Sequence, residues 1–212
     1  MIKWGWKILK NKAYLKVKRV LDIILSVIGI VVLSPLLIIS SICIKLTSKG
    51  PVIFKQKRIG KDGKVFDIYK FRSMIVGAEN MGTGVYSKKG DNRITKVGKV
   101  IRATSIDELP QLFNILKGEM SFIGPRPVLT YHPWKYEEYT EEQLKRFVVR
   151  PGITGWAQIH GRKDVEWHKR IELDVYYVEN ISFKLDLKIF FKTIYQVILM
   201  KDNVNKGETS KK

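Results

Sequence analysis

Two adjacent acids, Asp107 and Glu108, are the best candidates for catalysis in a chain crowded with cations. They lie near the expected start of a helix, where the helix dipole favours negative charge. Neighbouring helical positions point about 100° apart, so one carboxylate could attack a substrate while the other holds a metal ion. Taken alone, an acidic pair in a first helical turn is more often a capping feature.

Arginines beside glycine and proline, or just before a helix, are the candidates for binding phosphate. A guanidinium binds an oxyanion through two parallel hydrogen bonds, although for any single arginine a solvated charge is the commoner outcome. The candidates are Arg102, Arg126, Arg150 and Arg162. The three histidines show no metal-binding spacing, and the sequence has no Walker-type loop and no Ser/His/Asp motif.

Composition limits the class of protein and its partners. The 212 residues are 45% apolar, which excludes disorder of the whole chain. Lysine and arginine number 39 against 20 acids, so the net charge is +19. Nucleic acid, anionic lipid or a phosphorylated substrate would each suit this charge. The single cysteine, Cys43, excludes an internal disulfide and favours a body that faces a reducing cytoplasm.

Residues 23–44 are an uncharged run of 22 residues, and a helix needs about 20 to cross hydrocarbon. No signal-peptide cleavage site follows, so we expect the chain to keep this segment. Basic residues flank both ends, and such flanks favour the cytoplasm. A hairpin that returns to its original side keeps both flanks there, whereas a single crossing does not.

Ser34 and Pro35 supply a bend in the middle of this run. Proline removes a helical hydrogen bond, leaving two arms of about ten residues, each too short to cross alone. The Ser34 hydroxyl could bond a freed carbonyl. A kinked, spanning helix is an equal alternative on helix physics, and the charge pattern favours the re-entrant form. Asp22 is expected to pair with Lys18 or Arg19 at the interface or, less commonly, to bind a lipid head group.

The rest of the chain predicts mixed structure. Two strand-like runs, 51–58 and 64–74, surround a Gly-Lys-Asp-Gly turn and predict a β-hairpin. Residues 76–90 predict a loop or lid. A helix is expected over 97–118 and a polar helix over 137–146.

The boundaries of the helix over 97–118 depend on its caps. Ser105 stands three residues before Glu108, as in a capping box, and Gly118 is a stop signal. Pro110 fits only the first helical turn, so Asp107 is an alternative N-cap.

The C-terminal part predicts a helix over 181–200, with Lys184, Lys188 and Lys192 on one face. Such a helix could lie in a membrane interface or be an ordinary amphipathic helix. We therefore expect an α+β, predominantly helical fold with a re-entrant membrane helix-break-helix, a small β-hairpin and interfacial helices. The expected divisions are a basic N-terminus with the membrane hairpin (1–45), a catalytic body (46–200) and a disordered tail (201–212).

Several long motifs together resemble the bacterial sugar transferases called monotopic phosphoglycosyl transferases. The resemblance runs from about Lys18 to Ile198, and the chain looks like the minimal, single-domain form. The motifs are KRVLDIILSVIGIVVLSPLLI, SKGPVIFKQKRIGKDGKVFDIYKFRSM, IRATSIDELPQLFNILKGEMSFIGPRP, RPGITGWAQIHGR and ELDVYYVENISFKLDLKI.

The resemblance implies transfer of sugar 1-phosphate from a UDP-sugar to undecaprenyl phosphate, with release of UMP. By the same resemblance Asp107 is the nucleophile that forms a covalent phosphosugar, and Glu108 helps to hold Mg²⁺. Arg102 and Arg126 are implied phosphate or acceptor contacts. Lower-ranked candidates for the nucleotide-sugar site are Lys70, Arg72, Arg150, Gln158 and Arg162. Lys18, Arg19 and Asp22 match the motif that precedes the membrane segment, and Ser34-Pro35 matches the family's helix break, which makes the re-entrant form the preferred one.

The implied location is the cytoplasmic face of the bacterial inner membrane, at the first membrane step of surface polysaccharide synthesis. Downstream glycosyltransferases are possible partners there, and no nucleic acid is expected. Two other classes stay open. A membrane-anchored nucleic-acid binder would explain the charge, and a non-catalytic scaffold would keep the membrane hairpin without using nucleotide sugars.

Overall fold

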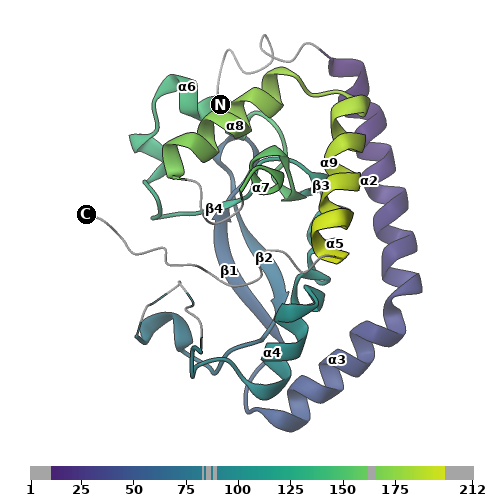
Figure 1. The fold of residues 1–212 in the computed structure, drawn as a ribbon, viewed down its shortest axis with the longest axis vertical. Coiled ribbons are helices and arrows are strands. Elements are labelled where there is room, and N and C mark those ends of the chain that lie inside the picture. The colour runs from purple at the N-terminus through teal and green to yellow at the C-terminus, as the bar shows by residue number, and fades with distance from the viewer. Residues whose placement is uncertain (1–10, 83, 85–86, 88–89, 162–165, 199–212) are drawn as a thin grey trace.

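The computed structural model describes residues 11–82, 84, 87, 90–161 and 166–198. Helices dominate these residues, and they accompany a three-stranded and a two-stranded sheet (Figure 1). Helices α2 (Lys12–Val32) and α3 (Ser34–Thr47) form one long edge of the molecule, and the body lies within the angle between them. The expected α+β, predominantly helical class is confirmed.

The break between α2 and α3 falls at Leu33, and Pro35 lies in the first turn of α3, where its missing N–H costs no helical bond. The Ser34 hydroxyl donates to the Val31 carbonyl at 2.8 Å, as predicted. The two helices bend by 61° and together have the length and apolar composition of a broken membrane segment. Among the described residues, no helix by itself is both long and apolar enough for a crossing. The helical arms hold 21 and 14 residues, longer than expected, because α2 begins among the basic residues.

Helix α2 buries a polar stripe and exposes an apolar face. Its buried residues stand four apart and pack toward the body: Tyr14, Lys18, Asp22 and Ser26. Its exposed apolar residues include Val17, Val20, Leu21, Ile24, Leu25, Ile28, Val31 and Val32. A helix in water shows the opposite arrangement.

The predicted ion pair of Asp22 with Lys18 or Arg19 is wrong. Lys18 instead pairs with Asp186, 168 residues away. Asp22 accepts hydrogen bonds from the Ser121 hydroxyl at 3.0 Å and the Phe122 N–H at 3.1 Å. Asp22 therefore bonds the body of the protein rather than its own helix.

The predicted hairpin is confirmed. Strands β1 (Ile53–Ile59) and β2 (Val65–Phe71) are antiparallel, with Ile53 opposite Phe71 and Ile59 opposite Val65. A short turn, η1 (Lys61–Gly63), joins them. Sequence patterns do not predict the three short strands. Strand β4 (Val128–Leu129) pairs with β1, and β3 (Ser121–Ile123) and β5 (Gly152–Thr154) form a separate parallel pair.

The single helix expected over 97–118 is wrong, because the chain forms three separate pieces. These are α4 (Lys96–Ala103), the turn η3 (Ile106–Glu108) and α5 (Gln111–Lys117). Ser105 adopts a positive φ of 58° and makes no side-chain cap, so neither a continuous helix nor the capping box forms. Asp107 lies within η3 rather than at an N-cap. Gly118 ends α5 in the left-handed conformation, as predicted.

The remaining elements are short pieces and two longer helices. The polar helix expected over 137–146 is divided, because Tyr139 is extended between two helical pieces. The C-terminal helix is confirmed as α9, while the predicted tail over 201–212 lies outside the described residues. The elements are η2 (Ala78–Asn80), inside the predicted loop, η4 (Tyr136–Glu138), α6 (Glu141–Leu144), η5 (Lys145–Phe147), α7 (Trp156–Ile159), α8 (Trp167–Glu179) and α9 (Phe183–Ile198).

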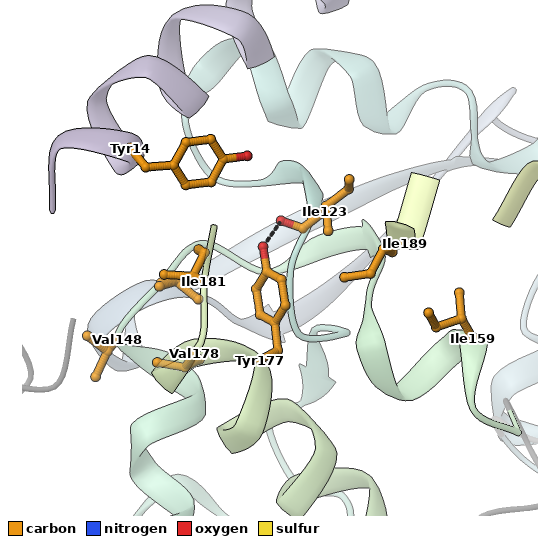
Figure 2. Close-up of a cluster of buried hydrophobic side chains, with 9 residues drawn as sticks. Tyr14, Ile123, Val148, Ile159, Tyr177, Val178, Ile181 and Ile189 are labelled. Carbon is orange, nitrogen blue, oxygen red and sulfur yellow. Dashed lines mark hydrogen bonds between the residues drawn. The ribbon is translucent and has the colours of Figure 1, made fainter. Parts of the chain in front are cut away.

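A core cluster joins α2 to the body (Figure 2). Tyr177 of α8 lies at its centre, fully buried, with its hydroxyl 3.3 Å from the Ile123 carbonyl oxygen. That hydroxyl donates to Asp186 of α9 at 2.7 Å, and the Tyr14 hydroxyl donates to the other oxygen of Asp186 at 2.6 Å. Helices α2, α8 and α9 are therefore fixed together by both apolar packing and hydrogen bonds.

Candidate active site

Asp107 and Glu108 lie in the turn η3, between α4 and α5 and against strand β2. The left-handed conformation of Ser105 turns the chain just before them. Both acids are partly buried. The chain forms a tight turn at this point, so the two carboxylates lie at the junction between α4 and α5 rather than on a helix surface.

Glu108 is paired with two cations from other parts of the chain. Its Oε1 accepts from Lys70 Nζ of β2 at 2.6 Å and from Arg126 Nη2 at 3.5 Å. Burial alone would raise the pKa of Glu108, but Lys70 and Arg126 together outweigh it and lower the pKa to about 2. Glu108 is therefore ionised at neutral pH.

Asp107 differs from its neighbour because no described residue forms a hydrogen bond or ion pair with its carboxylate. Burial raises its pKa, and repulsion from Glu108 adds to this, against the opposing charges of Lys70, Arg102 and Arg126. A carboxylate held among cations but bonded to none is available to an incoming group.

Arg58 of β1 is a further residue of this site, and sequence reasoning missed it. Its Nη1 donates to the Pro127 carbonyl at 3.1 Å, and its buried Nε has no hydrogen-bond partner among the described residues. Burial, and then the charge of Arg126, lower the pKa of Arg58 to about 10. The hairpin register offered a signal. Lys70 is paired with Phe54 across the hairpin, and Phe54 lies on the same face of β1 as Arg58 because side chains alternate with a two-residue period. Lys70 and Arg58 therefore lie on the same face of the hairpin.

The backbone of Arg126 accepts a hydrogen bond from Arg146, which belongs to a buried ion pair with Asp174. Arg146 Nη2 donates to the Arg126 carbonyl at 3.0 Å and to Asp174 Oδ2 at 2.6 Å. The side chains of Arg146 and Asp174 are each only 2% exposed. The Arg126 side chain is about half exposed, so its guanidinium can contact both Glu108 and a bound anion.

The other predicted site residues occupy different places. Arg102, in the last turn of α4, donates to the Ser87 hydroxyl at 2.7 Å and lies close enough to Asp107 to influence its pKa. Arg72 is buried and donates to the carbonyls of Ser48 and Lys49 just after α3. Arg72 thus ties the end of the bent helix pair to the sheet.

Gln158 and Arg150 make no hydrogen bond or ion pair with either of the two acids. Gln158 of α7 has both side-chain polar atoms buried without hydrogen-bond partners among the described residues. Arg150 donates through Nε to the Gly118 carbonyl at 2.7 Å, at the end of α5 away from Asp107. Arg162 lies outside the described residues.

The acidic pair suits Mg²⁺ better than a metal that needs an all-protein site. The described residues hold no cluster of three or more His, Cys, Asp or Glu side chains. Mg²⁺ commonly uses one or two carboxylates and takes its other oxygens from water and substrate phosphates. Glu108 fits that pattern, because it is ionised and its hydrogen bonds to described residues all involve Oε1.

Comparison with known proteins gives a consistent result. Residues 13–200 match the family described as bacterial sugar transferase. The chain is 46% identical over 194 residues to a UDP-N-acetylgalactosamine-undecaprenyl-phosphate N-acetylgalactosaminephosphotransferase of Aeromonas hydrophila, covering 90% of this chain and 46% of that protein. It is 46% identical over 189 residues to a UDP-glucose:undecaprenyl-phosphate glucose-1-phosphate transferase of Klebsiella pneumoniae, covering 87% and 40%.

A third relative is close to this chain in length. An uncharacterized sugar transferase of Bacillus subtilis is 45% identical over 183 residues, which cover 86% of this chain and 87% of that protein. The chain spans less than half the length of the Aeromonas and Klebsiella relatives. The matched part contains every described residue of the site.

Proposed function

The chain belongs to the bacterial sugar transferase family, and from this premise we propose that it transfers a sugar 1-phosphate from a UDP-sugar to undecaprenyl phosphate and releases UMP. The names of two relatives state both kinds of substrate. The observation that carries the proposal is the unbonded Asp107 carboxylate beside an ionised Glu108 that Lys70 and Arg126 hold.

The transfer proceeds in two displacements at one phosphorus atom. An oxygen of Asp107 attacks the phosphorus that bears the sugar, the bond to the UMP oxygen breaks, and UMP leaves with the bonding electrons. An oxygen of undecaprenyl phosphate then attacks the same phosphorus and releases the Asp107 carboxylate. The product is a lipid-linked diphosphosugar. Covalent catalysis of this kind lets a soluble donor and a membrane acceptor use one site in turn.

The cations around the acids stabilise the charge of the reacting phosphoryl group. Lys70 and Arg126 already flank Glu108, and Arg58 adds a third charge beside Arg126. Fixed donors of this type are most effective where water is partly excluded. Arg102 and Arg126 are the proposed contacts for the acceptor phosphate. Glu108 would hold Mg²⁺, which neutralises the donor diphosphate when bound.

The bent helix pair provides the membrane attachment. Apolar side chains face outward along α2 and α3, and the face of α2 toward the body is mostly polar. We place the pair as a re-entrant element in the cytoplasmic leaflet of the inner membrane, with α9 at the interface. An acceptor phosphate would stay at the head-group level, so Asp107 need not enter hydrocarbon. The reaction would start a surface polysaccharide, and downstream glycosyltransferases would use its product.

The test is UMP release from a panel of UDP-sugars by protein held in nanodiscs. Activity should require undecaprenyl phosphate and Mg²⁺, and Asp107→Asn should lower it by about 10⁴-fold or more, since the residue is the proposed nucleophile. With a radiolabelled donor and no acceptor, the wild-type protein should retain covalent phosphosugar. Covalent label on folded Asp107→Asn protein would refute the role of Asp107, and no UMP from any donor would refute the proposed reaction.

A further inference from the structure

A cavity of about 40 Å³ lies between the first turns of α2, strand β3 and the residues before β5. Four of its lining residues are cations: Lys18, Arg19, Lys61 and Arg150. Arg150 and Arg19 bond the C-terminal end of α5, whereas Asp107 precedes its first residue. The seven residues of α5 rise by about 10 Å, so the cavity is separate from the catalytic acids.

The end of α5 brings two guanidinium groups together. Arg19 donates to the carbonyls of Ile115 and Leu116 at 2.7 and 3.0 Å, and Arg150 Nε donates to that of Gly118. A Cβ atom on Gly118 would lie 3.3 Å from Arg19 Nη2 and 4.0 Å from Arg150 Nε. Two like charges are therefore held side by side at one wall of the cavity.

No carboxylate in the described part of the chain forms an ion pair with either arginine, although the charge of Asp22 acts on Arg19 from a greater distance. Neither Arg19 nor Arg150 forms an ion pair within 4.0 Å there. Asp22 lines the same cavity, but one of its oxygens already accepts two hydrogen bonds from β3. The two terminal nitrogens of Arg150 make no hydrogen bond to any described residue. Unused guanidinium donors beside a second guanidinium are the arrangement that binds an oxyanion through paired hydrogen bonds.

The position along α2 indicates where the anion comes from. Leu15, Lys18 and Arg19 line the cavity, and the exposed apolar face of α2 begins at Val17 and Val20 in the same turns. A helix that inserts by this face would hold the cavity at the level of lipid head groups. We propose that the cavity binds a phosphate group, presented by an anionic phospholipid or free in solution, at a site separate from the transferase centre.

Three single-charge variants test this proposal. Arg150→Gln removes the unused guanidinium. Lys117→Gln is the matched control, because Lys117 is an exposed cation at the same end of α5 that bonds Tyr69 and does not line the cavity. Arg126→Gln removes a cation of the catalytic centre. Arg150→Lys keeps the positive charge but lacks the paired donors of the guanidinium, and it replaces Arg150→Gln in the test if that variant does not fold.

Two measurements separate the sources of phosphate. The first follows the thermal stabilisation of detergent-held protein by inorganic phosphate, and the second counts phosphatidylglycerol molecules retained from mixed phosphatidylcholine vesicles by native mass spectrometry. We expect Arg150→Gln to weaken binding by about tenfold or more, with Arg150→Lys between it and the wild type and Lys117→Gln unchanged in both measurements. Arg126→Gln should retain phosphatidylglycerol like the wild type, and in the phosphate titration it should lose only the part of the response that comes from the catalytic centre.

Each outcome decides the proposal. Loss of retained phosphatidylglycerol in Arg150→Gln alone identifies a lipid head group, and loss of only the inorganic phosphate response identifies free phosphate. Equal behaviour of Arg150→Gln and Lys117→Gln in both measurements overturns the site. Neither measurement depends on sugar transfer, so the result stands whether or not the proposed transferase reaction is correct.

Discussion

Asp186 and Asp107 both lie near cations, but they differ in the number of hydrogen bonds that their carboxylates accept. Asp186 belongs to an anchor network with Tyr14, Lys18 and Tyr177, in which its two oxygens accept three hydrogen bonds. Asp107 accepts none from the described residues. Because a fully bonded buried charge stabilises one arrangement, the anchor network is suited to hold α2, while the unbonded acid is suited to react.

The cations near Asp186 and those near the acidic turn η3 also differ in whether their polar groups have partners. Lys18 is almost buried and has Asp186 as its ion-pair partner. Around the acidic turn η3, Lys70 and Arg126 both contact Glu108, and the buried Nε of the nearby Arg58 has no partner among the described residues. A buried polar group without a partner costs stability, and Arg58 Nε is such a group beside the proposed site for substrate phosphates.

The largest expected effect comes from breaking the anchor network. Asp186→Asn leaves the Lys18 ammonium without its charge partner in a buried place, so unfolding free energy should fall by about 3–5 kcal/mol. Urea unfolding in detergent measures this. Glu172→Gln is the control, since its pair with Lys169 is about two-thirds exposed and should change stability by less than about 0.5 kcal/mol. Equal effects of the two variants would show that the network does not anchor α2.

A smaller loss is expected at the acidic turn. Glu108→Gln removes the charge that Lys70 and Arg126 share, and Glu108 is 24% exposed, so the loss should be about 1–3 kcal/mol. Because the pKa of Glu108 falls from 4.5 to about 2 in the folded protein, its stabilisation is present above the ordinary value and disappears as pH falls toward 2. The deficit of the variant in urea unfolding should shrink over that range, and a constant deficit would contradict the ionic origin.

Local sequence signals anticipated the features that depend on neighbouring residues. The turn at Gly60-Lys61-Asp62-Gly63 predicted the hairpin, Ser34-Pro35 predicted the break, and Gly118 predicted the end of α5. The positive φ of Ser105 had no such signal, since neither glycine nor asparagine marks it. Sequence patterns therefore predict a continuous helix through the turn that carries the acids.

Contacts between distant segments escaped prediction for a different reason. Lys18 and Asp186 are separated by 168 positions, and Lys70 and Glu108 by 38. Charge patterns along the chain predict that Lys18 or Arg19 pairs with the nearby Asp22, and they give no sign that Arg58 lies beside the acids. Residue types and spacing select Asp107, Glu108 and Arg126 as candidates, and the motif resemblance implies their roles, whereas their partners require the folded chain.

The smallest expected effect has the opposite sign and tests the unbonded acid directly. Asp107→Asn should raise the unfolding free energy at neutral pH, by less than about 1 kcal/mol, while it abolishes transfer. Burial raises the pKa of Asp107 in the folded protein, so its ionised form costs stability above that pKa and the cost disappears as pH falls through it. As the pH is lowered, the unfolding free energy of Asp107→Asn measured in urea should therefore fall toward the wild-type value from above. That of Glu108→Gln should approach it from below. A loss of stability in Asp107→Asn at neutral pH would mean that the Asp107 carboxylate is bonded after all, and the contrast with Asp186 would fail.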